Sequence, residues 1–280
     1  MTDRRSLLGE AIRELAEAGI ASPDFDAAEL LAHVLGTTRG RLPLVDEVSP
    51  TAAVEYAVLV RRRAAREPLQ HLTGTAWFRH VELAVGPGVF VPRPETELLA
   101  GWAIEQASAL EAPTVVDLAT GSGAIAKAVA DEVPWAAVHA VELDPAAHEW
   151  ARRNLEGTGV ELRLGDLVTA YDELLGLVDV VTCNPPYIPL EAWESVAPEA
   201  RDHDPHLALF SGPDGLDTIR QLEQRAAVLL KPGGVVGVEH ADVQGESAPA
   251  VFAATGRWTG IRDHHDLAGR PRFVTARLAR

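Results

Sequence analysis

The spacing of the hydrophobic residues changes near residue 70 and divides the chain into two parts. Before that point, apolar side chains recur three and four positions apart, which is the period of an amphipathic helix. From residue 113 onward, short valine-rich apolar runs alternate with helical patterns. The first pattern predicts a small helical bundle and the second predicts a parallel α/β sheet. The strands are expected at residues 114–117, 137–142, 160–164, 178–183, 234–239, 258–262 and 272–278.

Start and stop signals favour helices in the first part. Ser22-Pro23 and Ser49-Pro50 each pair a capping side chain with a proline suited to a first helical turn, and Gly36 predicts a helix end. Further along the chain, Arg61-Arg62-Arg63 and Arg66 form a basic run. We expect this run to be a solvated helix face, with docking of a partner as the alternative.

In residues 75–92, apolar and polar residues alternate in the pattern typical of strands. Two strand patterns, at 75–78 and 81–85, precede the turn signal Gly86-Pro87-Gly88, so this segment is expected to be a β-hairpin linker. Pro94 is expected to lie in the first turn of the next helix. The predicted organisation is an N-terminal helical domain at 1–74, the linker at 75–92 and an α/β domain at 93–280.

Composition and charge exclude several classes of protein. Of the 280 residues 47% are hydrophobic, but no run approaches transmembrane length and the N-terminus lacks the apolar stretch of a signal peptide. A single cysteine, Cys183, excludes an internal disulfide and a thiolate metal cage. We therefore expect a cytoplasmic protein without a membrane segment. The loop histidines are expected to be solvated, so no metal site is predicted.

The net charge of −16 is concentrated in the larger part of the chain. Residues 76–280 hold 16 Lys and Arg against 30 Asp and Glu, whereas residues 1–75 hold 9 against 11. Proteins that bind nucleic acid through its phosphates normally offer a basic surface. The acidic balance therefore argues against DNA as a partner.

The tetrapeptide Asn184-Pro185-Pro186-Tyr187 is the strongest chemical signal in the chain. It follows the apolar run at 178–183, and two consecutive prolines must end that strand because they have no N–H to donate. The Pro185 carbonyl and the Asn184 amide oxygen are then available to accept both hydrogens of a planar –NH2 group, and Tyr187 can cover its face. We expect a substrate amino or amide group at Asn184, Pro185, Pro186 and Tyr187, with Asn184, Pro185 and Tyr187 as the catalytic residues.

A glycine-containing turn and three carboxylates precede this motif. Gly121 and Gly123 follow the strand at 114–117, where they allow a tight turn and close approach of a ligand. A nicotinamide dinucleotide is the first rival ligand, but Asp117 before the glycines would repel a pyrophosphate. Asp117, Glu142 and Asp166 end successive strands and match the ammonium, ribose and adenine groups of S-adenosylmethionine.

Together these motifs resemble the HemK/PrmC family of peptide chain release factor glutamine methyltransferases. The segment Pro92-Arg93-Pro94-Glu95-Thr96-Glu97 is the most family-specific. DNA amino-methyltransferases share the tetrapeptide Asn184-Pro185-Pro186-Tyr187, called the Asn184 motif below, but lack this segment. Ala119 and Leu167 stand where the family commonly has glycine and an aromatic residue. The other matching stretches are 67–74, 88–91, 117–124, 184–188, 231–234, Glu239-His240 and 266–270.

The resemblance implies a Rossmann-like class I methyltransferase sheet with a small N-terminal helical domain. It implies an enzyme that methylates the glutamine of the Gly-Gly-Gln motif in bacterial class I release factors on its side-chain nitrogen, N5. We expect the protein to be a monomer. The 1–74 domain would dock the release factor. The alternatives are an adenine- or cytosine-directed nucleic-acid methyltransferase and a non-catalytic module of the translation machinery. The implied cofactor residues are Phe90, Arg93, Thr96, Asp117, Ala119, Thr120, Gly121, Ser122, Gly123, Glu142, Asp166, Leu167 and Asn184.

Overall fold

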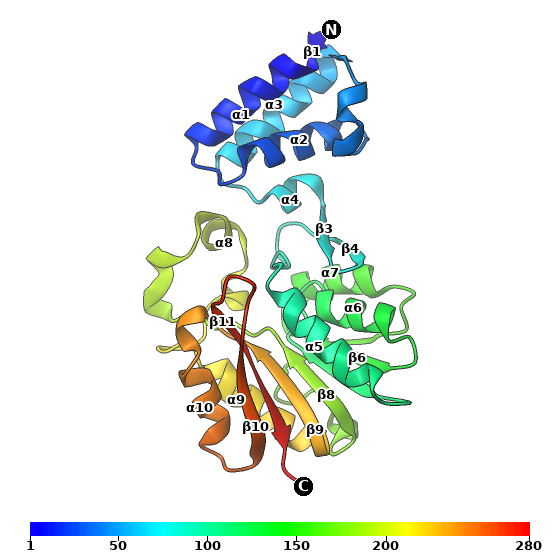
Figure 1. Ribbon diagram of the computed structural model, residues 1–280, viewed down its shortest axis with the longest axis vertical. Helices are drawn as coiled ribbons and strands as arrows, with labels where there is room; N and C mark the ends of the chain where they lie inside the picture. The colour runs from blue at the N-terminus through cyan, green and yellow to red at the C-terminus, as the bar shows by residue number, and fades with distance from the viewer. The chain divides into compact units, whose positions relative to one another are not determined.

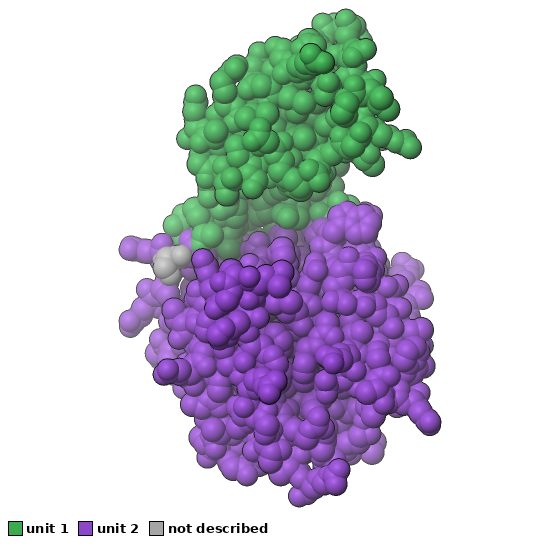
Figure 2. Space-filling view, in the orientation of Figure 1, with its two compact units in different colours: residues 1–75, 197–203 green, residues 76–196, 204–280 purple. Residues whose placement is uncertain are grey.

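The computed structural model describes residues 1–280, except for the side chain of Ser195. The chain forms two compact units (Figure 2). Unit 1 contains residues 1–75 and 197–203, and unit 2 contains residues 76–196 and 204–280.

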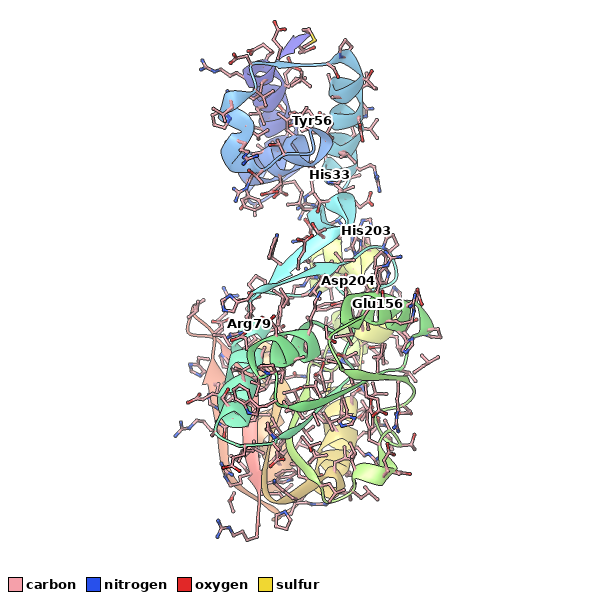
Figure 3. The ribbon with its side chains drawn as sticks, turned by 90° about the vertical axis from the view of Figure 1, so that its right-hand side faces the viewer. His33, Tyr56, Arg79, Glu156, His203 and Asp204 are labelled. Atoms are coloured by element: carbon pink, nitrogen blue, oxygen red, sulfur yellow. The ribbon has the colours of Figure 1, made fainter. Side chains whose placement is uncertain are left out.

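Unit 1 is built from helices around a small apolar core (Figure 1). Its largest buried side chains include Leu15, Leu30, Leu31 and Tyr56, which is labelled in Figure 3. The Tyr56 hydroxyl donates a hydrogen bond to the Ala27 carbonyl over 3.0 Å, and this bond satisfies the one polar atom of the ring. The helices are α1 (Arg4–Glu17), α2 (Pro23–Val34), α3 (Pro50–Ala64), α4 (Leu69–Thr73) and α8 (Pro198–His203), with the 3-10 helix η1 (Arg39–Leu44) and the short strand pair β1 (Thr2–Asp3) and β2 (Glu47–Val48).

The two Ser-Pro signals mark helix starts in different ways. At Ser49 the side chain accepts a hydrogen bond from the Ala52 N–H, as a capping serine should. Ser22 makes no such bond, and α2 begins instead with Pro23 and two acidic residues in its first turn. Proline and acidic side chains both suit a helix N-terminus, so the helix begins at the predicted position although Ser22 does not cap it.

The expectation that residues 61–66 form a solvated basic face is wrong for Arg63. The Arg63 side chain is buried, and its guanidinium lies 2.7 Å from Asp26 and 3.1 Å from Glu199. Arg66 also pairs with Glu199, and Arg62 pairs with Glu67. The sequence pattern missed the partners of Arg63 and Arg66 because Asp26 and Glu199 come from other helices of unit 1.

Glu199 also explains why residues 197–203 belong to unit 1, although the sequence analysis places them in the α/β domain. Glu199 lies on α8 and binds two arginines of the N-terminal segment, 136 and 133 positions away in the chain. The compact unit is therefore not continuous in sequence.

Unit 2 contains a seven-stranded sheet with the strand order β10-β11-β9-β8-β5-β6-β7. Five neighbouring strands run parallel, and β11 pairs antiparallel with both of its neighbours. This confirms the predicted Rossmann-like α/β sheet. The strands are β5 (Thr114–Leu118), β6 (Ala137–Glu142), β7 (Glu161–Leu164), β8 (Val178–Cys183), β9 (Leu230–Glu239), β10 (Trp258–His265) and β11 (Pro271–Leu278).

Helices cover both faces of this sheet (Figure 1). Alternate strand residues serve the two faces: Val115 and Val180 pack against α5, α6 and α7, whereas Val116 and Val181 pack against α9 and α10. Because both faces are covered, the inner strands β5 and β8 are buried along almost their whole length, whereas the outer strands β7 and β10 carry exposed polar residues. The helices are α5 (Thr96–Ser108), α6 (Ala124–Glu132), α7 (Pro145–Leu155), α9 (Asp217–Leu229) and α10 (Ser247–Ala253), and short 3-10 helices lie at Asp172–Leu174, Leu190–Ser195, His206–Ala208 and Asp242–Gln244.

The predicted hairpin forms, but it packs into unit 2 as part of that unit's core. Its strands β3 (Thr75–Phe78) and β4 (Val81–Ala84) pair with each other, and Phe78 and Leu83 are buried among the residues of α5, α6 and α7. The Asn154 side chain on α7 bonds both backbone groups of Ala84, at 2.7 and 2.9 Å. The hairpin is thus anchored to the cofactor-binding half of the sheet.

The segment after the hairpin leads directly into α5. Pro94 lies in a turn before this helix, whose first residue is Thr96. The prediction that Pro94 sits in the first helical turn is therefore wrong by two positions, a shift common at helix boundaries. None of the helices in the described residues is both long and apolar enough to cross a membrane.

Candidate active site

The predicted site residues converge at the carboxyl-terminal edge of the parallel strands. From β5 the chain proceeds to β6 and β7 on one side, and β8 and β9 lie on the other side. The strand order thus reverses between β5 and β8, and ligands of open α/β sheets bind at such a point. The glycine turn follows β5 and the Asn184 motif follows β8, so both flank the reversal.

The loop between β5 and α6 has a backbone shaped for a ligand. Ala119, Gly121 and Gly123 all have positive φ, at 59°, 59° and 84°. A Cβ on Gly121 would meet no atom within 4 Å, so open space lies beside this glycine. Glycine is the usual residue at such φ, so Ala119, which stands where the family commonly has glycine, adopts this backbone conformation at some conformational cost.

Asp117 lies beneath this loop as a buried carboxyl group. The Thr120 hydroxyl donates to its Oδ2 over 2.5 Å, and the Thr182 hydroxyl of β8 donates to its Oδ1 over 2.8 Å. Burial raises the pKa of Asp117 to about 6, although both hydroxyl hydrogen bonds oppose the rise. The group is therefore ionised at pH 7 and held in one orientation, as binding of an ammonium group requires.

Glu142, at the end of β6, holds the glycine loop in place. Its Oε2 accepts a hydrogen bond from the Gly121 N–H, and its Oε1 accepts one from the Asp144 N–H, both at 2.8 Å. Burial raises the pKa of Glu142, and these backbone hydrogen bonds oppose the rise. Each carboxylate oxygen has a second lone pair, so both oxygens can still accept from two ribose hydroxyls.

Asp166 and Leu167 follow β7, which lies one strand further than β6 from the point where the strand order reverses. The exposed Asp166 carboxylate accepts a hydrogen bond from the Val168 N–H, and Leu167 packs at the edge of the core formed with α9 and α10. Within the part of the chain that the structure describes, Asp166 forms no hydrogen bond with another predicted site residue. Its proposed role therefore rests on its position at a strand end.

The Asn184 motif presents two free acceptors. The Asn184 Nδ2 donates to the Thr96 hydroxyl over 3.2 Å, so the side-chain oxygen Oδ1 is turned away from Thr96. Among the described residues, neither Asn184 Oδ1 nor the Pro185 carbonyl accepts a hydrogen bond. The Tyr187 hydroxyl donates to Glu239 Oε1 over 3.2 Å. The structure thus brings together Thr96, Asn184 and Tyr187.

Glu239 is a site residue to which the sequence analysis assigned no role. It ends β9 and is 1% exposed, and the Tyr187 hydroxyl donates a hydrogen bond to its carboxyl group. Burial raises the pKa of Glu239 to about 7. Asp117 and Glu142 were predicted as site residues because each is an acid at the end of an apolar strand. Glu239 has the same position at the end of β9, so the same pattern could have predicted it.

The segment before α5 is fixed by a second residue that the sequence did not reveal. The Arg93 guanidinium lies 4.8 Å from the centre of the Phe90 ring and donates to Asp204 over 2.7 Å. Asp204, labelled in Figure 3, has a fully buried side chain. Burial raises the pKa of Asp204 to about 6, with Arg93 opposing the rise. The structure therefore joins Phe90 and Arg93 through a contact 111 positions away in the chain.

Cys183 and His240 have structural roles. Burial raises the pKa of the Cys183 thiol well above its usual value, so it does not supply a thiolate. The His240 ring is buried and bonds the Ala241 carbonyl and Asp263, each at 2.8 Å. Among the described residues, no group of three His, Cys, Asp or Glu side chains could hold a metal ion.

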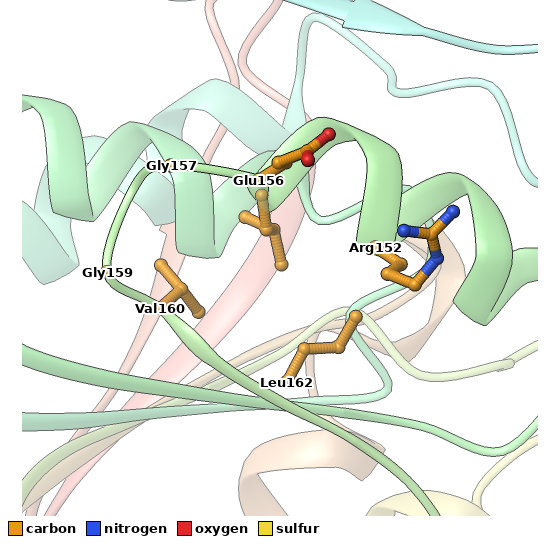
Figure 4. Close-up of a pocket in the computed structure, with 7 residues that line it drawn as sticks. Arg152, Glu156, Gly157, Gly159, Val160 and Leu162 are labelled. Atoms are coloured by element: carbon orange, nitrogen blue, oxygen red, sulfur yellow. The ribbon is translucent and has the colours of Figure 1, made fainter.

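A surface cavity of about 300 Å³ lies elsewhere, between the end of α7 and the loop into β7 (Figure 4). It is lined by Arg152, Leu155, Glu156, Gly157, Gly159, Val160 and Leu162. None of the predicted site residues lines it. This cavity is therefore separate from the candidate active site.

The residues at the strand ends fit S-adenosylmethionine. Its amino acid end has an ammonium group for Asp117, and its ribose has two hydroxyls for Glu142. The open space beside Gly121 leaves room for a ligand next to the loop. The loop offers carboxylates and no cationic side chain, so the set suits a cofactor without phosphate.

Two family models match the chain. One, described as the PrmC N-terminal domain, matches residues 6–74. The other, described as the methyltransferase small domain, matches residues 93–197.

Relatives match along nearly the whole chain. The "Release factor glutamine methyltransferase" of Streptomyces coelicolor is 58% identical over 274 residues, covering 97% of both chains. A second relative has a different name. The "4-amino-L-phenylalanine/4-methylamino-L-phenylalanine methyltransferase" of Streptomyces pristinaespiralis is 45% identical over 264 residues, covering 90% of this chain and 88% of that protein.

The fold is also found among solved structures. The structure described as "hMettl16 catalytic domain in complex with MAT2A 3'UTR hairpin 6" aligns with a TM-score of 0.56 and 12% identity, covering 84% of both chains. At this identity the match shows a shared methyltransferase fold alone.

Proposed function

This chain belongs to the release factor glutamine methyltransferase family, and we propose that it methylates the Gly-Gly-Gln glutamine of bacterial class I release factors on its side-chain nitrogen, N5. The methyl donor is S-adenosylmethionine. The single observation that supports this substrate most strongly is the pair of free acceptors, Asn184 Oδ1 and the Pro185 carbonyl, at the carboxyl end of β8. Two carbonyl oxygens match the two hydrogens of a primary amide.

The cofactor would be held by the loop and strand ends of β5, β6 and β7. Asp117 would bind its ammonium group and Glu142 its ribose hydroxyls. Asp166 would accept from the adenine amino group, with Leu167 beside the ring. Phe90, Arg93 and Thr96 would close the side next to α5. The remaining proposed contacts come from Ala119, Thr120, Gly121, Ser122, Gly123 and Asn184.

When bound, S-adenosylmethionine supplies an electrophilic methyl group. An amide nitrogen is a weak nucleophile because its lone pair is delocalised into the carbonyl. Hydrogen bonds from the –NH2 to Asn184 Oδ1 and the Pro185 carbonyl localise that pair and orient the nitrogen. Pro186 keeps the loop extended and Tyr187 packs against the amide plane. Catalysis by these residues is thus orientation and electrostatic stabilisation.

The alkylated nitrogen is strongly acidic, so its surplus proton can pass to water. A dedicated general base is therefore not required for turnover. This agrees with Cys183 and His240 being tied into the core of unit 2. The proton leaves after the N–C bond has formed.

Partner recognition is proposed for the N-terminal domain, residues 1–74. This domain holds none of the candidate site residues, so its contribution would be affinity for a large substrate. We also propose that the protein is a cytoplasmic monomer that does not bind DNA. All candidate site residues come from unit 2 of one chain, and residues 76–280 are strongly acidic.

The test compares three acceptors with labelled S-adenosylmethionine: a purified class I release factor, the same factor with its Gly-Gly-Gln glutamine changed to alanine, and duplex DNA. Label should enter the first alone. A short Gly-Gly-Gln peptide should also react, with a higher KM than the whole factor because it lacks the docking contacts. Labelling of the alanine variant or of DNA would refute the proposed substrate.

A second candidate function comes from the Streptomyces pristinaespiralis relative, whose name specifies aromatic amines. The aryl –NH2 of 4-amino-L-phenylalanine is also planar and could donate to the same two acceptors. We therefore include 4-amino-L-phenylalanine in the assay at the concentration of the peptide. Faster transfer to this amine than to the peptide or the release factor would favour the second function.

A further inference from the structure

We propose that Gln244 is a positioning residue: by holding the Tyr187 carbonyl, it fixes the place of the Pro185 carbonyl that accepts the substrate –NH2. Gln244 lies in the 3-10 helix Asp242–Gln244, which follows β9. This inference rests on the proposed function, in which the Pro185 carbonyl is one of the two acceptors for the substrate amide. Gln244 itself would touch neither substrate nor cofactor.

The side chain of Gln244 joins three segments of unit 2. Its Nε2 donates to the Tyr187 carbonyl over 3.0 Å and to the Asp214 carbonyl over 3.2 Å, and its Oε1 accepts from the Ala241 N–H over 2.9 Å. Gln244 is 4% exposed, so water does not readily replace these bonds. Tyr187 lies 57 positions away in the chain, so this contact exists only in the folded protein.

The orientation of the Gln244 amide follows from its partners. The carbonyls of Tyr187 and Asp214 can only accept a hydrogen bond, and the Ala241 N–H can only donate one. The –NH2 end must therefore face the two carbonyls, and the oxygen must face Ala241. The reverse orientation would lose all three hydrogen bonds.

The Asn184 motif needs such a support because its two prolines have no N–H. Pro185 and Pro186 cannot anchor the loop by donating, and the Pro185 carbonyl has to stay free for the substrate. The Tyr187 carbonyl, two residues further along, provides a point of attachment instead. The proline rings hold φ at about −65°, so the backbone between Pro185 and Tyr187 is stiff. A displacement of Tyr187 is therefore passed on to the Pro185 carbonyl.

The peptide group that joins Tyr187 to Ile188 is bonded at both ends. Gln244 holds its C=O, and its N–H, which belongs to Ile188, donates to the Leu209 carbonyl over 2.9 Å. The Tyr187 ring is held separately, since its hydroxyl donates to Glu239. Loss of the Gln244 amide would therefore release the Tyr187 carbonyl and leave these other contacts in place.

Gly215 shows how closely the Tyr187 carbonyl is enclosed. A Cβ at this position would overlap the Tyr187 oxygen and would lie 2.8 Å from Gln244 Nε2. Gly215 also has φ of 75°, a conformation that favours glycine. The glycine thus lets the segment before α9 pack directly against the hydrogen bond between Gln244 and Tyr187.

The test measures kcat and KM on a Gly-Gly-Gln peptide at saturating S-adenosylmethionine in wild type, Q244M and Q244E. Methionine has a similar length but donates no hydrogen bond, and an ionised glutamate keeps an oxygen for the Ala241 N–H but offers no hydrogen to Tyr187. We expect kcat to fall about 10- to 100-fold in both variants, because a small displacement of an acceptor misaligns the reacting nitrogen. Cofactor affinity by calorimetry should be unchanged, since the three hydrogen bonds of Gln244 go to residues outside the proposed cofactor site.

Two controls separate positioning from a general loss of stability. W258F removes a buried hydrogen bond to Glu223 at the opposite end of the sheet from the Asn184 motif, and it should retain the wild-type kcat. Q221M makes the same substitution at an exposed glutamine of α9 and should also retain activity. Circular dichroism checks that each variant is folded at the assay temperature.

A double variant tests whether Gln244 acts through the motif. N184A/Q244M should lose less kcat than the product of the two single losses, because both changes disturb the same pair of acceptors. A purely structural role of Gln244 would make the two losses multiply.

Wild-type kcat in folded Q244M or Q244E would overturn the inference, and so would losses that multiply in the double variant or an equal loss in W258F. Failure of both Gln244 variants to fold would assign this residue to stability and would overturn the inference as well. If wild type methylates neither the peptide nor a release factor, the proposed function itself fails. If wild type and Q244M are equally active, only the positioning role fails.

Discussion

The Asn184 side chain donates a hydrogen bond from Nδ2 to the hydroxyl of Thr96 over 3.2 Å, and the two residues are 88 positions apart. This bond joins the motif after β8 to the family-specific segment that begins α5. It leaves Asn184 Oδ1 as an acceptor for a substrate amide.

Replacing Asn184 with alanine should lower kcat on the order of a hundredfold or more, because an oriented hydrogen bond to the reacting nitrogen is lost. The affinity for S-adenosylmethionine should change little, since Asn184 would supply one minor cofactor contact while Asp117 and Glu142 remain. Steady-state kinetics and calorimetry on the same preparation check both parts. Near-normal kcat in N184A would contradict the role of Asn184.

Replacing Glu142 with alanine should weaken cofactor binding by about 1.5–3 kcal/mol or more, because charge-assisted hydrogen bonds to the ribose are lost. The change also removes the acceptor for the Gly121 N–H, so the loop loses its support. Calorimetry measures the affinity. E142Q keeps one oxygen and should bind better than E142A; unchanged affinity in E142A would place the carboxylate outside the cofactor site.

Cofactor affinity should fall as the pH drops below about 6, the pKa to which burial raises Asp117. Above this pH the group is ionised and attracts an ammonium; below it the group is neutral and the attraction is lost. The expected loss is about tenfold per pH unit. Titrations at several pH values test this, with D117N as the control. D117N should bind weakly at every pH, and a wild-type affinity independent of pH would contradict the assignment.

Replacing Ala119 with glycine should stabilise unit 2 by about 0.5–1 kcal/mol. Ala119 has φ of 59°, where an L side chain is strained and glycine is not. The matched control is A130G on α6, where glycine in a helix should cost about 0.5–1 kcal/mol. Denaturant unfolding of both variants measures the difference. Destabilisation of equal size in both would show that the strain at Ala119 is negligible.

Replacing Arg63 with alanine should destabilise unit 1 by about 3 kcal/mol or more, because Asp26 and Glu199 would lose a buried partner. Its neighbour Arg61 is exposed, so R61A should change the free energy of unfolding by less than about 0.5 kcal/mol. Thermal and denaturant unfolding of the full chain provide the comparison. Similar stability of the two variants would mean that the ion pairs are solvated in solution.

The strand pattern shows how far local signals reach. The strand patterns predicted all seven strands of the sheet, and they are clearest for the inner strands β5 and β8, because strands covered on both faces are mostly apolar. The N-terminal helices were predicted equally well from their period and from the Ser49 cap. The Ser22 cap, the position of Pro94 and the burial of Arg63 were not, since each depends on neighbours that local patterns do not specify.

The sequence by itself determined the Asn184 motif, the glycine turn and the acids at three strand ends, because each is a short segment with a defined chemistry. Tertiary structure alone decided the partners of these residues: Thr96 for Asn184, Thr182 for Asp117, Asp204 for Arg93 and Glu239 for Tyr187. These pairs lie 88, 65, 111 and 52 positions apart. Hydrogen bonds act over about 3 Å, so contacts at such separations exist only once the strands have been ordered in the sheet and the helices packed on it.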